Sequence, residues 1–106
     1  MALWPASFMA DEVGVVHTPI KVLEIVLRRD YAECTITGRD RQGYRHTLHF
    51  GPGTKVHKLP EGVAADMSEV LRQTQRFPLV KDQEVLVTWK LYLPKRQKVA
   101  LKLTYY

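Results

Sequence analysis

Alternating apolar and polar side chains predict β-strands along most of the chain. Residues 20–29 are apolar on both faces of an extended segment, with Leu23, Ile25 and Leu27 on one face and Val22 and Val26 on the other. Two apolar faces are typical of a strand that is central in a sheet or covered on both sides. We therefore expect a strand here, followed by a turn at Asp30.

The next two strands are predicted at 31–37 and 44–50 and form a hairpin. Ala32, Cys34 and Ile36 are expected to point inward in the first strand. In the second strand one face carries Tyr44, His46, Leu48 and Phe50, and the other carries Arg45, Thr47 and His49. The segment 38–43 has the glycines and polar residues of a hairpin loop. Residues 51–60 hold two glycines and two prolines and are expected to form a loop.

A helical repeat follows the loop. Apolar or small side chains recur at helical spacing between residues 63 and 74, at Val63, Met67, Val70, Leu71 and Thr74. This spacing predicts one amphipathic helix, which ends before Pro78 because proline cannot continue it.

Two more strands are predicted at 83–93 and 99–106, so the element order is β-β-β-α-β-β. The apolar stripe of the helix needs a sheet to cover. The fold class is therefore predicted to be α+β, with a five-stranded, mainly antiparallel, curved sheet packed on one helix.

The chain of 106 residues is expected to form one domain over residues 20–106, preceded by an apolar arm over residues 1–19. Trp4 and Phe8 make this arm a candidate for binding a partner, although packing on its own domain is the simpler interpretation. With 45% hydrophobic and 25% charged residues, the composition excludes disorder, collagen and coiled coil for the whole chain.

Cysteine usage and the N-terminus bear on the compartment. Cys34 is the single cysteine, so an internal disulfide is impossible. The first ten residues have no basic side chain and no long apolar core, which is unlike a secretory signal. No apolar run is long enough for a membrane span. We expect a cytoplasmic protein, or a virus-encoded one in a host cell, that is not secreted.

The net charge of +5 is concentrated in one part of the sequence. Residues 1–84 contain 11 basic and 11 acidic side chains, whereas residues 85–106 contain five basic side chains and no acid. The last two predicted strands and the loop between them carry this excess, and tyrosines are interleaved with lysines along the strands. Two registers are considered for this hairpin: Lys90 opposite Lys102, or Lys90 opposite Ala100. The first brings like charges together, which costs stability.

Lysines bind phosphates, and tyrosine rings on a sheet stack on unpaired bases. The sequence therefore predicts a nucleic-acid-binding face on the C-terminal hairpin, made of Lys90, Tyr92, Lys95, Arg96, Lys98, Lys102 and Tyr106. Secondary basic contacts are expected from Arg39, Arg41, Lys55 and Lys58. The simpler interpretation is a solvated lysine-rich edge that blocks aggregation, and an acidic protein partner for the hairpin is also open. The arginines around the first strands are more simply explained as paired surface charge.

Motifs for catalysis or metal binding are weak. The segment 51–55, Gly-Pro-Gly-Thr-Lys, resembles a phosphate-binding loop but lacks the Walker spacing. His46 and His49 point to opposite faces of a strand, so they do not bind one metal together. His46 is expected to be a hydrogen-bonded core or rim residue, and Cys34 a core filler.

We therefore expect a small basic protein that binds nucleic acid, with single strands favoured, and that is not an enzyme. It is expected to need no cofactor and no metal. DNA and RNA are both open. The alternative is an adaptor, inhibitor or assembly subunit that uses the arm and the exposed tyrosines to bind a protein partner or a second copy of itself.

Overall fold

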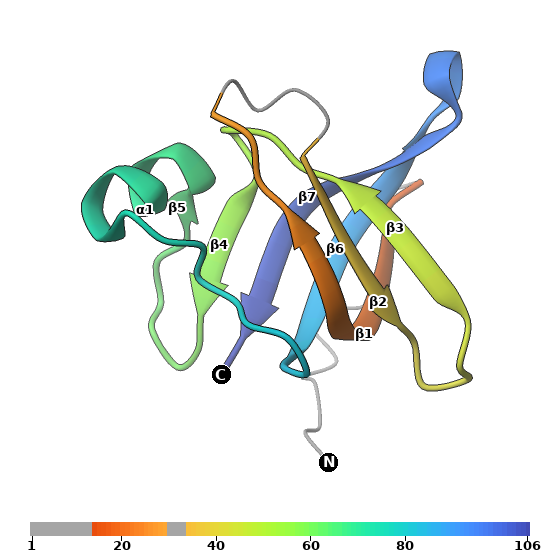
Figure 1. The fold of residues 1–106 in the computed structure, drawn as a ribbon, viewed down its shortest axis with the longest axis horizontal. Helices are drawn as coiled ribbons and strands as arrows, with labels where there is room; N and C mark the ends of the chain where they lie inside the picture. The colour runs from red at the N-terminus through yellow and green to blue at the C-terminus, as the bar shows by residue number, and fades with distance from the viewer. Residues whose placement is uncertain (1–13, 30–33) are drawn as a thin grey trace.

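The computed structural model of this chain describes residues 14–29 and 34–106, which form a β-barrel with one helix at its side (Figure 1). The positions Trp4, Phe8 and Ala32 lie outside the described residues, so the predictions for the arm and for that inward position remain predictions. The strands are β1 (Val16–Val26), β2 (Thr35–Arg39), β3 (Arg45–His49), β4 (Lys55–Lys58), β5 (Ala65–Asp66), β6 (Glu84–Tyr92) and β7 (Gln97–Tyr105). The helix α1 spans Met67–Thr74, and a short 3₁₀ turn, η2, spans Leu93–Lys95.

The predicted curved sheet closes into a barrel, which corrects the sequence-based expectation. Five strands run in the order β3-β2-β1-β6-β7, and β7 pairs back with β3. This closing pair is parallel and joins Leu48 to Lys98 and His49 to Val99. Over residues 14–29 and 34–106, the mixed α/β class, the single α-helix and the dominance of antiparallel pairs are confirmed.

Two further strands extend the barrel at the other half of β7. β4 pairs with β7 in parallel from Lys55 to Lys58, and β5 pairs with β4. The loop predicted at 51–60 from its glycines and prolines therefore contains a short strand. β4 has only one buried apolar residue, Val56, so apolar alternation gives no signal for it. The free edge of β7 is therefore divided between β3 and β4.

The predicted central position of the first strand is confirmed, because β1 pairs with β2 on one side and with β6 on the other. A bulge also contributes to its two apolar faces. β1 has an irregular register between Val22 and Glu24 in its pairing with β2. A bulge inserts one residue and moves the inward side of the strand from one parity to the other. Accordingly Ile20 and Val22 are buried before the bulge, and Ile25 packs on the core after it. β1 also begins at Val16, within the segment that the sequence assigns to the arm.

Gly38 lies inside β2, although the sequence predicts a loop at that position. A Cβ atom at Gly38 would lie 2.6 Å from the carbonyl oxygen of Lys21 and 2.8 Å from Cδ1 of Ile20. Only glycine lets β2 approach β1 this closely. The hairpin turn is correspondingly shorter and centres on Asp40–Gly43.

The helix starts at Met67, later than the apolar stripe predicts. Val63, the first residue of that stripe, lies before the helix and is 81% exposed. Met67 is fully buried, and Val70 and Leu71 pack against the barrel core. The helix ends at Gln75, which adopts a left-handed conformation with φ 57° and donates its N–H to the carbonyl of Leu71. The stop therefore precedes Pro78 by three residues.

The core confirms the inward positions of Cys34 and Ile36, and Leu48 and Phe50 are buried in the same cluster. Tyr44, on the same predicted face as Leu48, is instead 67% exposed because it precedes the first residue of β3. The last two long strands add Val85, Val87 and Leu103 to the cluster. Phe50 also packs against Phe77 at 5.3 Å between ring centroids. Within the described residues, no helix has the length and apolar composition needed to cross a bilayer.

Candidate nucleic-acid interface

The β6–β7 hairpin projects beyond the barrel, with the turn η2 at its end (Figure 1). Pro94 lies in the 3₁₀ turn, and Arg96 closes it in a left-handed conformation with φ 50°. Lys90, Tyr92, Lys95 and Arg96 are all exposed, and we call these four residues the hairpin tip. No ion pair joins any of them to an acid among the described residues.

The register with Lys90 opposite Lys102 is wrong, and the register with Lys90 opposite Ala100 holds only from Leu86 to Thr88, where Thr88 lies opposite Lys102. A bulge between Thr88 and Trp89 then shifts the pairing by one residue. Beyond it, Lys90 lies opposite Val99 and Tyr92 opposite Gln97. The predicted opposition of Lys90 and Lys102 therefore does not occur, and the hairpin avoids its cost.

The same bulge moves Lys98 off the predicted face. Lys98 lies opposite Leu91, on the side of Trp89 rather than on the side of Lys90. Its ammonium group lies 4.9 Å from the centroid of the Trp89 ring and 2.7 Å from Nδ1 of His46. The indole N–H of Trp89 in turn donates to Oγ1 of Thr18 at 2.9 Å. Lys98 thus has a structural role, because it contacts two residues of the barrel, Trp89 and His46.

His46 connects Lys98 to the turn of the other hairpin, which confirms its expected role as a hydrogen-bonded rim residue. An ammonium group only donates, so Nδ1 of His46 accepts, and Nε2 carries the proton that is donated to Asp40 at 2.8 Å. The hydrogen bond from His46 lowers the pKa of Asp40 most, and the backbone N–H groups of Tyr44 and Gln42 lower it further. The two hydrogen bonds, from Lys98 to His46 and from His46 to Asp40, hold β7, β3 and the β2–β3 turn together.

Lys102 and Tyr106 lie away from the hairpin tip. Lys102 is half-buried and pairs in register with Lys55 of β4. Tyr106 is 58% exposed and follows the last residue of β7, at the opposite end of that strand from the tip. The structure therefore brings together four of the seven residues predicted for this face.

Three of the four secondary basic residues have partners within the fold. Arg39 donates to the carbonyl of Gly43 at 3.1 Å, Arg41 forms an ion pair with Glu84 at 3.2 Å, and Lys55 pairs with Asp66. Lys58 is exposed at the end of β4 and lines a surface hollow. The interpretation of the early arginines as paired charge agrees with the ion pair of Arg41, whereas Arg39 donates to an uncharged carbonyl.

The structure adds three residues that the sequence did not assign to the site. Arg45, Thr47 and His49 occupy alternate positions of β3, on the opposite side from the buried Leu48. His49 is in register with Val99, and Val99 is in register with Lys90. One outward surface therefore runs from Arg45 along β3 to Lys90 and Tyr92. We call it the outer wall. Because it depends on the closing pair between β3 and β7, the local sequence pattern contains no signal for it.

The segment 51–55 has a structural role. Thr54 Oγ1 accepts from the N–H of Gly51 at 3.1 Å and donates to the carbonyl of Ala100 at 3.0 Å. The carbonyls of Pro52 and Thr54 accept from the first residues of α1. These bonds attach the start of the helix to β7. In residues 14–29 and 34–106, no group of three or more histidine, cysteine, aspartate or glutamate side chains is placed to hold a metal ion.

Comparisons of the chain with protein-family models, with curated proteins and with solved structures gave no match.

Proposed function

We propose that this protein binds single-stranded nucleic acid on the outer wall and the hairpin tip and that it has no catalytic role. The observation that carries the proposal is the continuity of this surface. Two register pairs link His49 of β3 to Lys90 of β6 through Val99. Arg45 and Thr47 lie on the same side of β3 as His49, and Tyr92 lies on the same side of β6 as Lys90. Exposed cations thus lie at both ends of one face, and a tyrosine that is 44% exposed lies at one of them.

The chemistry of these side chains suits a nucleic-acid strand. Arg45 at one end and Lys90, Lys95 and Arg96 at the other would neutralise phosphates and release counterions. The ring of Tyr92 would stack on one base, and the hydroxyl of Thr47 and the ring of His49 would contact the strand between. Because phosphate contacts carry no sequence information and stacking tolerates every base, weak sequence preference is expected.

The architecture gives separate support. A five-stranded barrel with strands β1, β2, β3, β6 and β7 is the architecture of OB-type barrels. Those barrels bind oligonucleotides or oligosaccharides on their second and third strands and on the loop between their fourth and fifth strands. Here the corresponding parts are β2, β3 and the hairpin tip. Because one fold hosts many functions, the similarity of architecture is only additional support. The main support is the continuous outer surface of β3, Lys90 and Tyr92.

The test is a fluorescence-anisotropy titration with a labelled oligothymidylate of about 12 nucleotides, a length suited to one small barrel. The double variant Lys90→Glu/Arg96→Glu is expected to weaken binding by about tenfold or more, because it turns two phosphate contacts into repulsions. Lys81→Glu changes the same type of charge on the exposed turn before β6, at the other end of that strand. It serves as the control and is expected to change affinity by less than about threefold.

Three results would contradict the proposal. One is the absence of binding by the wild-type protein at low salt. Another is an equal loss of affinity in the control and the double variant, which would indicate a general effect of net charge. The third is an affinity that the double variant retains.

A further inference from the structure

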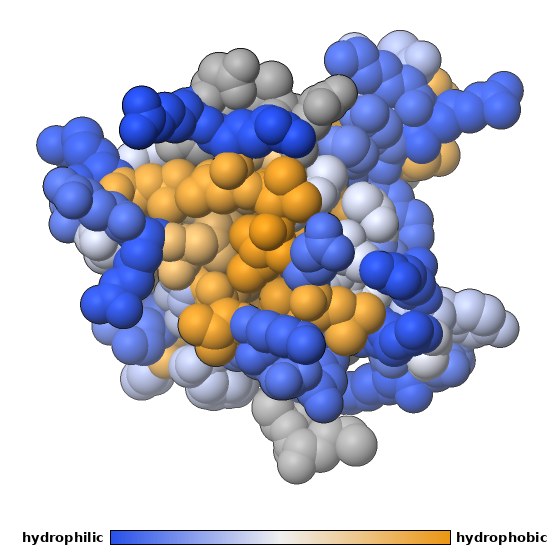
Figure 2. All heavy atoms as spheres, in the orientation of Figure 1, coloured by the Kyte–Doolittle hydropathy of each residue, from blue (hydrophilic) through white to orange (hydrophobic). Residues whose placement is uncertain are grey.

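A second surface lies on another part of the barrel, between the end of β1 and the helix. A hollow of about 570 Å³ is lined by Leu27, Arg28, Arg29, Leu71, Gln75 and Arg76. A second hollow of about 400 Å³ shares Arg76 with it and extends along the helix past Val70 and Phe77 to Val80. We call the two hollows together the arginine-rimmed groove. Figure 2 shows an apolar area in this part of the surface, bordered by hydrophilic side chains.

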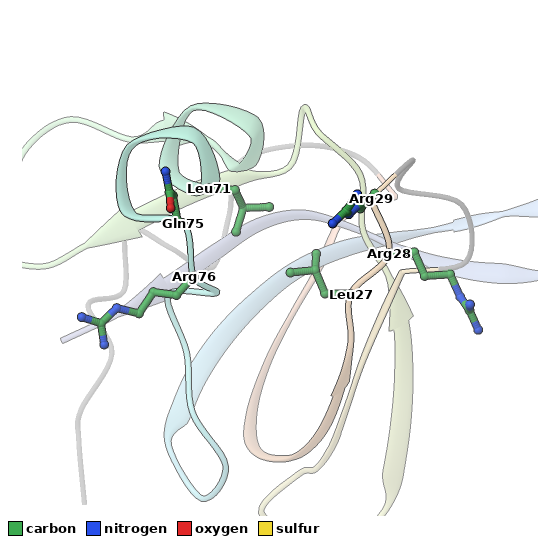
Figure 3. A pocket seen from close by; sticks show the side chains of 6 residues that line it. All are labelled: Leu27, Arg28, Arg29, Leu71, Gln75 and Arg76. Atoms are coloured by element: carbon green, nitrogen blue, oxygen red, sulfur yellow. The ribbon is translucent and has the colours of Figure 1, made fainter.

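The floor of the groove is aliphatic and partly open to solvent. Leu27 is 43% exposed and Val80 is 66% exposed. Leu27 and Leu71 face each other across the first hollow (Figure 3). Exposed apolar side chains that cluster in a concave site, with a polar rim, are typical of places where another molecule docks.

The rim of the groove is positive. Among the described lining residues there are four cations, Arg28, Arg29, Arg76 and Lys58, and no acid. Glu61 is close enough to Tyr105, which lines the second hollow, to raise the pKa of that phenol, although burial raises it more. The occupant that complements this rim carries negative charge.

The arrangement of the arginines favours an extended occupant over a small anion. In Figure 3, Arg28 and Arg76 point to opposite sides, away from the space between Leu27 and Leu71. Their guanidinium groups therefore do not converge on one phosphate or carboxylate. A longer ligand would reach both of them, with acidic groups on either side of an apolar anchor.

The floor also distinguishes a peptide from a nucleic acid. Stacking of bases needs an exposed aromatic face. The aromatic rings of this groove are Phe77, which packs against Phe50, and Tyr105, which is 9% exposed. Leucine and valine side chains instead suit an inserted leucine or phenylalanine. A second copy of this chain is a poor occupant, since its net charge is also +5.

We propose that the arginine-rimmed groove binds an acidic peptide segment of a partner protein, with a large apolar side chain between Leu27 and Leu71 and acidic residues beside Arg28 and Arg76. This proposal is independent of nucleic-acid binding at the outer wall.

The test uses a fluorescein-labelled peptide of about ten residues, made of aspartate and glutamate around a central Leu-Phe pair. A matched peptide has Ala-Ala at the centre and the same charge. The probes are titrated by anisotropy into the full chain, and the oligothymidylate is titrated in parallel. The variants are Arg76→Glu, which changes the groove, and Arg96→Glu, which changes the hairpin tip.

We expect the Leu-Phe peptide to bind at least about fivefold more tightly than the Ala-Ala peptide, because the apolar anchor supplies much of the affinity. Arg76→Glu should lower the affinity for the Leu-Phe peptide by at least about fivefold and leave the affinity for the oligonucleotide unchanged. Arg96→Glu should leave the peptide affinity unchanged. The peptide results would support the groove even if the wild-type protein did not bind the oligonucleotide.

Each other pattern would overturn the proposal. Equal binding of the two peptides would mean that charge alone attracts them. An unchanged peptide affinity in Arg76→Glu would place the peptide elsewhere. Loss of oligonucleotide binding in Arg76→Glu, together with competition between the two probes, would make the groove part of the nucleic-acid surface. A dimer that Arg76→Glu dissociates would assign it to a second copy.

Discussion

The two long hairpins of this barrel are both basic and both carry an exposed tyrosine, yet their charged groups are used differently. In the β2–β3 hairpin, Arg39 and Arg41 bond to Gly43 and Glu84, and Asp40 accepts from two backbone N–H groups and from His46. In the β6–β7 hairpin, Lys90, Lys95 and Arg96 are exposed, and none of them is paired with an acid among the described residues.

The difference shows that counting charges does not separate structural cations from those that can bind a ligand. Lys98 has the same charge as Lys95 and lies three residues away, but a bulge turns it toward His46 and Trp89. We therefore call the β2–β3 hairpin the braced hairpin, because the charged side chains of its turn are bonded within the barrel. We call the β6–β7 hairpin tip the binding part. Four predictions test this distinction.

The largest effect is expected at the root of the braced hairpin. Gly38→Ala would force a Cβ atom against Lys21 and Ile20, and we expect it to lower the free energy of unfolding by about 2–3 kcal/mol. Gly53→Ala is the control, since no heavy atom lies within 4 Å of the added Cβ. Its effect should stay within about 0.5 kcal/mol in urea denaturation. Equal effects would show that β2 does not approach β1 closely.

The two exposed tyrosines should differ in binding. Tyr92 lies at the end of the outer wall, whereas Tyr44 is 67% exposed but precedes Arg45 and so points to the other side of β3. Tyr92→Ala should weaken oligothymidylate binding by about 1–3 kcal/mol, because it removes a stacking partner. Tyr44→Ala should cost less than about 0.5 kcal/mol in the same titration. A reversed order would move the site to the β2–β3 hairpin.

The bracing at Asp40 should appear as acid sensitivity. Because the pKa of Asp40 is lowered in the folded chain, its stabilisation is present above its unfolded pKa and is lost as the pH falls through the folded pKa. Asp40→Asn should therefore lower stability near neutral pH and lose less stability than the wild type below about pH 4. Glu69, whose pKa is lowered by Arg72, adds an acid dependence common to both proteins. Parallel stability curves in urea at each pH would contradict the bracing role of Asp40.

The smallest effect is expected at the exposed ion pair of the braced hairpin. The side chains of Arg41 and Glu84 are 42% and 36% exposed, and exposed pairs contribute about 0–1 kcal/mol. Arg41→Gln should lower stability by less than about 1 kcal/mol, with a smaller loss at high salt. Its oligonucleotide affinity should match that of the wild type. A loss as large as that of Lys90→Glu/Arg96→Glu would place Arg41 in the binding part.

Local patterns predict the elements of this fold better than they predict its closure. Strands β3 and β6 and the burial of Ile36, Leu48 and Val87 follow from simple alternation. The closing pair of the barrel joins Leu48 to Lys98, 50 positions apart, through two register pairs, and no local pattern encodes it. β4 has one buried apolar residue and resembles a loop in the sequence.

The sequence predicts the part of the candidate site at the exposed hairpin tip. It does not predict the residues whose position in the site depends on the register between strands. Lys90, Tyr92, Lys95 and Arg96 lie together as the sequence predicts. A bulge changes the face of every residue beyond it, and alternation alone does not show where a bulge occurs. For this reason the sequence places Lys98 on the wrong face of the hairpin. It gives no signal for Arg45 and His49, because they join the site only through the closing pair between β3 and β7.

The salt dependence of oligonucleotide binding tests the central claim most directly. The measurement compares the wild type with the triple variant Lys90→Gln/Lys95→Gln/Arg96→Gln between about 50 and 200 mM salt. The wild-type affinity should fall steeply, and the triple variant should have a slope smaller by about 2, since each phosphate contact contributes about 0.7 on single strands. The same slope in both proteins, or a wild-type affinity that does not change with salt, would show that the hairpin tip does not contact phosphates.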